Sequence, residues 1–163
     1  MLLLLSFALA DSVTLTPVAG VVTPSTFKPG LRVGWELDPR LALEAVGVWD
    51  GYRAGDPAAI SAGLGLTGRA WFAGQPGHGV YLHGRAVVGI GIEEDFTRPW
   101  GGLQGGFGAR PRPWIGVEAA MGPEYGLGLP VWRSELSLTF VFGDSLRKQP
   151  GSGSVRHHPR PVP

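Results

Sequence analysis

Ten ionisable residues fall on one register of a two-residue periodicity that runs through the sequence, and acids and bases are nearly balanced among them. They are Arg32, Glu36, Glu44, Arg69, His83, Arg85, Arg110, Glu118, Arg133 and Glu135. Arginine is the preferred partner for enclosed carboxylates, whereas lysine is common on solvated surfaces. Because lysine occurs only as Lys28 and Lys148, the set predicts a network of ion pairs in a confined space.

The same residues offer a second interpretation, a hydrolase triad. His83 and Arg85 could lie near Ser61 and Glu44, which would bring a base, a hydroxyl and a carboxylate together. No His-x-Ser arrangement accompanies them. We therefore favour a structural ion-pair network and expect no enzymatic activity.

Two further patterns resemble cofactor or metal sites. The stretch from Gly63 to Gly68 matches the GxGxxG dinucleotide fingerprint, but that fingerprint needs a helix after its glycines, and these glycines lie within a predicted strand. His157 and His158 are adjacent in a stretch that is not expected to fold, and there are no cysteines. We expect no cofactor and no bound metal.

Composition excludes several classes of protein. Charged residues make up only 17% of the chain, and the formal net charge of +1 gives no reason to expect nucleic acid as a partner. Residues 143–163 are basic and rich in glycine, serine and proline, so they are predicted to be a disordered tail. Residues 1–10 end in Ala8-Leu9-Ala10 after an apolar run, which predicts a signal peptide, with a buried terminal strand as the alternative.

The clearest periodicity lies in Val80 to Ile92, where small or apolar residues alternate with a register that contains Tyr81, His83 and Arg85. A period of two residues predicts a β-strand with two different faces. Seven other segments show the same pattern, and no segment shows a helical period. The eight predicted strands are 12–22, 31–37, 41–52, 59–72, 80–92, 100–110, 114–121 and 132–142.

Short turns alternate with longer loops between these segments, which predicts an all-β fold, a closed eight-stranded antiparallel up-and-down barrel over residues 11–142. The register without charges would form a continuous apolar belt too large for a soluble monomer. We therefore expect that belt to face lipid, with the charges in a lumen where glycines make room for them. A soluble, lipocalin-like ligand-binding barrel with the opposite orientation, and a narrow pore, are the alternatives.

Aromatic residues are expected in two bands where the barrel meets the membrane interfaces. One band would lie at the rim of the short turns and the other at the rim of the longer loops. The first band comprises Trp35, Phe72, Trp114, Phe140 and Phe142, and the second Trp49, Trp100 and Trp132.

With these strands, the turn from Leu37 to Leu41 and the last strand from Ser134 to Phe142, the chain resembles the small eight-stranded OmpA/OmpX-like outer-membrane barrels. The resemblance covers about residues 12–142. It implies an outer-membrane location, contact with membrane lipid, the barrel-assembly machinery as a partner during insertion, and a monomer. The expected role is structural or one of surface interaction, through the loops around Glu93 to Trp100 and Tyr125 to Val131.

Overall fold

The computed structural model describes residues 12–22, 26–49, 60–92, 97–125 and 130–143. The predicted signal peptide, the tail beyond Gly143 and residues 93–96 and 126–129 of the two predicted contact loops lie outside these residues. Among the described residues, no helix is long and apolar enough to cross a bilayer.

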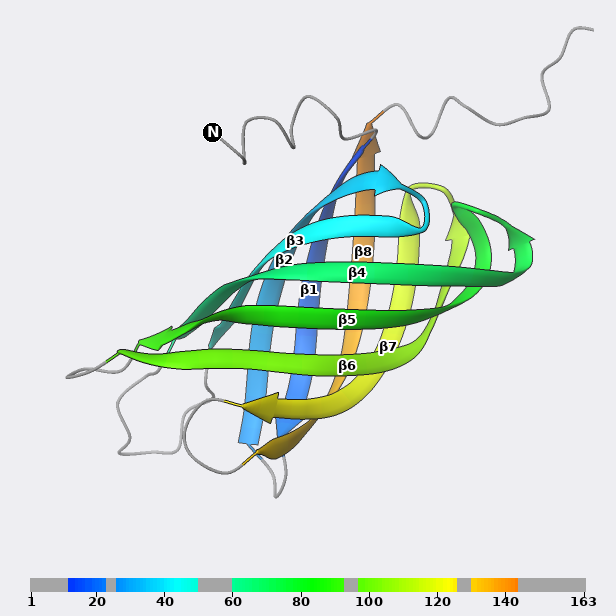
Figure 1. Cartoon of the computed structure of the whole chain (residues 1–163). Coiled ribbons are helices and arrows are strands. Elements are labelled where there is room, and N and C mark those ends of the chain that lie inside the picture. Colours follow the sequence, from blue (N-terminus) through cyan, green and yellow to red (C-terminus); the bar gives the residue numbers. More distant parts are fainter. Residues whose placement is uncertain (1–11, 23–25, 50–59, 93–96, 126–129, 144–163) are drawn as a thin grey trace, which may run out of the picture.

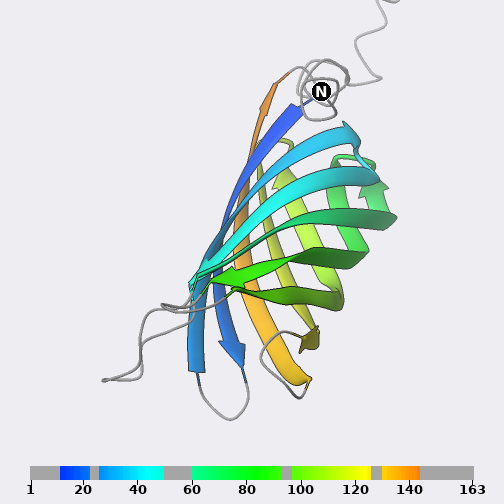
Figure 2. The same cartoon turned by 60° about the vertical axis from the view of Figure 1, so that its left-hand side comes forward.

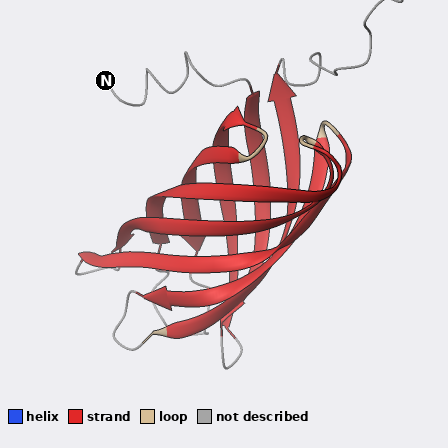
Figure 3. Cartoon of the chain, turned by 45° about the vertical axis from the view of Figure 1, so that its right-hand side comes forward, coloured by secondary structure: helices blue, strands red, loops and turns tan. Residues whose placement is uncertain are grey.

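All described secondary structure is β, as Figure 3 shows. Each strand pairs with the next in antiparallel fashion, and β1 also pairs with β8, so the sheet closes into a barrel with the strand order of the chain (Figure 1). The expected fold class is confirmed. The strands are β1 (Ser12–Val22), β2 (Thr26–Asp38), β3 (Leu41–Trp49), β4 (Ile60–Gln75), β5 (His78–Ile92), β6 (Thr97–Arg112), β7 (Ile115–Tyr125) and β8 (Val131–Gly143).

The short turns gather at one end of the barrel, together with the start of β1 and the end of β8 (Figures 1 and 2). Pro76 and Gly77 occupy the β4–β5 turn, and Gly77 has a φ of +88°, a left-handed conformation that glycine adopts without steric penalty. In the β2–β3 turn the Arg40 amide donates to Asp38 Oδ1 at 2.7 Å. These are the positions at which the sequence predicted tight turns.

Along each strand, buried and exposed residues alternate. On β5, Tyr81, His83 and Arg85 are 0%, 5% and 3% exposed, whereas Leu82 and Val88 are 56% and 72% exposed. The charged register therefore faces the lumen and the apolar register faces outward. This orientation is opposite to that of a soluble ligand-binding barrel, whose apolar face turns inward.

Several strands are longer than predicted, and in β2 and β7 the additional residues include Pro29 and Pro123. β2 begins before Pro29, and β7 continues through Pro123. The β2–β3 pairing starts only at Gly30, and the β6–β7 pairing is interrupted next to Pro123. Each proline therefore lies where its strand has no regular hydrogen-bonded pairing with one of its two neighbours. The N–H that proline lacks would have no ladder partner on that side.

Inward-facing glycines serve two purposes, of which the sequence predicted one. At Gly108 a Cβ would lie 2.5 Å from the Tyr81 ring, so this glycine does make room for a lumen side chain. At Gly106 and Gly122 a Cβ would instead lie 2.0 and 1.9 Å from the backbone oxygens of Ala119 and Leu103. There glycine permits close approach of neighbouring strands, which a tightly curved sheet requires.

A charged lumen as the candidate functional site

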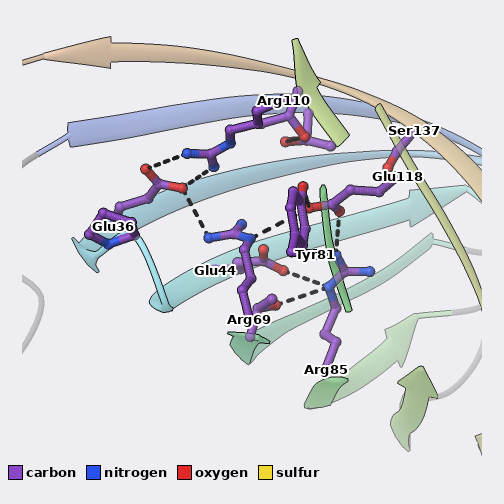
Figure 4. Close-up of polar contacts among 12 residues, drawn as sticks. Glu36, Glu44, Arg69, Tyr81, Arg85, Arg110, Glu118 and Ser137 are labelled. Atoms are coloured by element: carbon purple, nitrogen blue, oxygen red, sulfur yellow. Dashed lines mark hydrogen bonds and ion pairs between the residues drawn. The ribbon is translucent and has the colours of Figure 1, made fainter. Parts of the chain in front are cut away.

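Glu118 on β7 lies in the lumen and accepts three hydrogen bonds, from side chains on β2 and β5 (Figure 4). Tyr81 Oη donates to it at 2.9 Å, Arg32 Nη2 at 3.0 Å and Arg85 Nη2 at 2.9 Å. Arg69 Nε adds an ion pair at 3.6 Å. The carboxylate is only 2% exposed, so its charge is compensated almost entirely by these donors.

Arg85 on β5 is the main donor of the network. Its Nε lies 2.8 Å from Glu44 Oε2, and its Nη1 lies 2.6 Å from Glu135 Oε1. Thr67 and Gln104 accept further hydrogen bonds at 3.1 Å each. A planar guanidinium with several donors suits this arrangement, since a lysine ammonium could not present them in the same fixed geometry.

At the short-turn end, Glu36 holds a second group of charges (Figure 4). Its carboxylate accepts from Arg69 Nη1 at 2.9 Å, from Ser12 Oγ at 3.0 Å and from the Arg110 guanidinium. The Arg110 guanidinium also lies over the Trp71 ring, 5.9 Å from its centroid. These contacts join β1, β2, β4 and β6 across the lumen.

At the loop end, the network contains two residues that the sequence analysis missed. Glu124 accepts from Lys28 Nζ at 2.9 Å and from Arg133 Nη1 at 3.1 Å, and Arg133 Nε also lies 3.3 Å from Glu135. Lys28 and Glu124 stand next to Pro29 and Pro123, in stretches that were predicted to be loops. Their position in the two-residue register would have placed both in the lumen if those strands had been extended.

The structure places all ten predicted lumen residues inside the barrel, each less than 9% exposed. Nine of them, together with Lys28 and Glu124, form one chain of ion pairs that continues from Glu36 to Lys28. Among the described residues, the buried charges of the lumen are six cationic and five anionic side chains. Near-complete pairing is required, because an unpaired charge in such a site is costly.

His83 is the exception among the ten. It is 5% exposed, but neither ring nitrogen has a hydrogen-bond partner among the described residues. Its nearest ring contact is Tyr81, with centroids 6.1 Å apart. A general base must hydrogen-bond the group that it activates, so this geometry provides no basis for the triad interpretation.

Both ends of the lumen are filled with side chains. Towards the short turns, the Trp71 and Tyr81 rings pack against each other in a tilted arrangement, with centroids 4.5 Å apart. Towards the loops, Val46, Val48 and Val87 form an apolar cluster against Trp100. The cavity between this cluster and the charges measures about 20 Å³, which is room for about one water molecule.

Two of the predicted interface aromatics are placed differently from the expectation. Trp100 shares its register with Gln104 and Arg110, and its side chain packs against the valine cluster inside the barrel. Trp35 has the outward register but is only 7% exposed. Phe140 is partly buried on the outer face. The remaining predicted aromatics are between 47% and 64% exposed, namely Trp49, Phe72, Trp114, Trp132 and Phe142.

No protein-family model matches the sequence, and no curated protein matches it either. Solved structures do resemble the fold. The N-terminal β-barrel domain of Pseudomonas aeruginosa OprF gives a TM-score of 0.67 at 16% identity, covering 82% of this chain and 98% of that one. A de novo designed transmembrane β-barrel gives 0.56 at 13% identity, covering 82% and 97%. Neisserial surface protein A gives 0.51 at 15% identity, covering 80% and 93%.

At these identities the likeness concerns the fold. It extends over the whole barrel, since the described strands run from Ser12 to Gly143 and the compared chains are covered almost completely. The expected resemblance is therefore confirmed at the level of architecture. The chain has the closed eight-stranded fold of the small outer-membrane barrels.

Proposed function

We propose that this protein is an integral outer-membrane β-barrel whose lumen is plugged by its own charged side chains, and that its role is structural or one of surface interaction. The observation that carries the proposal is that the barrel exposes apolar side chains on its outside and buries charged side chains on its inside. Leu82, Val88 and Leu103 are between 56% and 72% exposed on the outside, while Arg85 and Glu118 are 3% and 2% exposed inside. A closed barrel satisfies its backbone hydrogen bonds internally, as lipid requires.

Fractionation of an outer-membrane-containing bacterium that expresses the full chain tests the location. The protein should remain with the outer membrane after carbonate extraction and should migrate differently on a detergent gel before and after boiling. A protein released by carbonate, with no boiling-dependent shift, would contradict the membrane location and support a soluble ligand-binding barrel instead.

The filled lumen predicts negligible solute flux. Single-channel recording in planar bilayers should show no steady conductance for the wild-type chain. Arg85→Ala removes the side chain that bridges Glu44, Glu118 and Glu135, so this variant should gain conductance. Leu82→Ala, on the outer face of the same strand, is the matched control and should stay closed. Steady wild-type conductance would favour the narrow-pore alternative.

Catalysis has no support in the lumen geometry, since His83 lacks a bonded nucleophile among the described residues. A surface role would fall to the loops, of which the described part includes Tyr125, 49% exposed at the end of β7. Membrane lipid is the partner that the apolar outer face requires. The assembly machinery and a monomeric state remain predictions from the resemblance.

A further inference from the structure

The outer surface over β3 to β8 contains a hollow of about 550 Å³. We call it the outer furrow. Its sides and ends are apolar side chains that point away from the lumen. They are Leu41, Leu66, Ala86, Leu103, Met121 and Trp132. Arg85 and Gln104 lie behind its floor, but their side chains bond one another and Glu135 inside the lumen.

The floor of the furrow is a row of three glycines on neighbouring strands. Gly68 on β4 is paired with Gly84 on β5, which is paired with Gly105 on β6. A Cβ at Gly68 or Gly84 would meet no atom within 4 Å, and one at Gly105 would meet only a backbone oxygen at 3.9 Å. The furrow is therefore open space bordered by larger side chains, and a side chain at the middle glycine would fill it.

The furrow runs obliquely along the barrel. Gly84 lies near the middle of β5, and Gly68 and Gly105 lie near the middles of β4 and β6. The row continues to Leu41, which pairs with Gly68 and is the first residue after the β2–β3 turn. One end of the furrow thus reaches the short-turn rim next to the exposed Arg40. The furrow crosses mid-depth at Gly84, and its other end lies at Met121 and Trp132, near the loop ends of β7 and β8.

These features indicate what kind of molecule would occupy the outer furrow. The mid-depth part of the furrow offers only hydrocarbon, and a lipid headgroup cannot reach the centre of a bilayer. The furrow is continuous with the lipid-facing belt, while its rim end has a cation suited to a phosphate. A second copy of the chain would have to bury about 1,000 Å² or more of surface for a stable contact. The hollow could supply only a small part of such a contact.

We propose that the outer furrow binds one acyl chain of a phospholipid from the leaflet at the short-turn rim, with the phosphate near Arg40. The inference rests on the proposed membrane location. In lipid there is no hydrophobic gain from leaving water, so binding depends on close packing around the chain. A furrow with side walls provides more such contacts than a flat surface would.

Native mass spectrometry of the folded full chain, released from detergent with dimyristoyl-phosphatidylglycerol, tests the proposal. The wild type should retain one lipid at collision energies that remove the others. Gly84→Leu fills the furrow and should lower the singly lipid-bound fraction about threefold or more, because packing contacts are lost. Gly47→Leu is the matched control, since Gly47 is also an outward glycine with its nearest neighbour at 3.9 Å but lies outside the furrow. It should behave like the wild type.

Arg40→Gln should reduce retention less than Gly84→Leu does, because the chain and not the phosphate fills the furrow. Equal retention by wild type and Gly84→Leu would overturn the proposal, as would loss with Arg40→Gln alone. A dimer that disappears in Gly84→Leu would show that a second copy occupies the surface and would also overturn it. A boiling-dependent gel shift confirms that each variant is folded. A barrel that shifts yet shows no lipid preference contradicts the furrow and leaves the membrane location intact.

Discussion

Arg85 and its neighbours Gly84 and Ala86 lie on the same strand but in opposite environments. The Arg85 guanidinium donates to five side chains from β3, β4, β6, β7 and β8, whereas a Cβ at Gly84 would meet nothing within 4 Å. The inner wall is therefore specified pair by pair. The outer wall presents apolar side chains to lipid, and the outer furrow is a hollow in it.

The largest expected effect comes from breaking the centre of the inner wall. Glu118→Ala removes the acceptor of Arg32 Nη2, Arg85 Nη2 and Tyr81 Oη in a site that is almost fully buried. Removing one partner of a buried ion pair typically costs about 3–5 kcal/mol. We expect a loss of this size in the free energy of unfolding, measured by urea titration in lipid vesicles with tryptophan fluorescence.

The matched control for that variant is Val117→Ala. Val117 precedes Glu118 on β7 and is 43% exposed on the outer face, so lipid can fill the space that the truncation leaves. Its effect should stay below about 1 kcal/mol. Equal losses for the two variants would mean that the ion pairs do not dominate the stability of the inner wall.

The next effect tests the outer wall. Leu82→Arg places a charge at an outward position that is 56% exposed, two residues from the mid-strand Gly84. Arginine on the lipid face costs about 2–4 kcal/mol near the bilayer midplane and about 0–1 kcal/mol near the interfaces. Val21→Arg, near the loop end of β1, should therefore cost less than Leu82→Arg in the same titration. The opposite order would be incompatible with the proposed membrane orientation.

The two-residue period made most of this comparison predictable. It assigned Arg85 to the inside and Leu82 to the outside without any three-dimensional information, because a strand alternates its side chains. The closure of the barrel followed from the alternation of short turns and longer loops. The period could not predict which lumen side chains would pair. That Glu118 accepts from Tyr81, Arg32 and Arg85 depends on the stagger between distant strands.

The errors also have physical causes. Proline lacks a ladder donor, and the predicted strands 31–37 and 114–121 stopped short of Pro29 and Pro123. Lys28 and Glu124 were therefore not assigned to the lumen. In the barrel each proline lies where one neighbouring ladder is absent. Trp100 was assigned by its residue type to an interface, although its register matched that of Gln104. Register proved the stronger signal, because a strand cannot turn one side chain against its period.

The smallest expected effects come from replacing one glycine by alanine on each wall of the barrel. Gly106→Ala, on the inside, would bring a Cβ to 2.0 Å from the Ala119 oxygen, and overpacking of this kind costs about 1–3 kcal/mol. Gly84→Ala, on the outside, meets no neighbour and reduces the freedom of the unfolded chain, so it should stabilise the barrel by about 0.4–1 kcal/mol. The urea titration should thus give opposite signs for one substitution type on adjacent strands. Destabilisation by both would mean that the outer glycine is also sterically required, and the outer furrow would then be a consequence of backbone packing instead of open space.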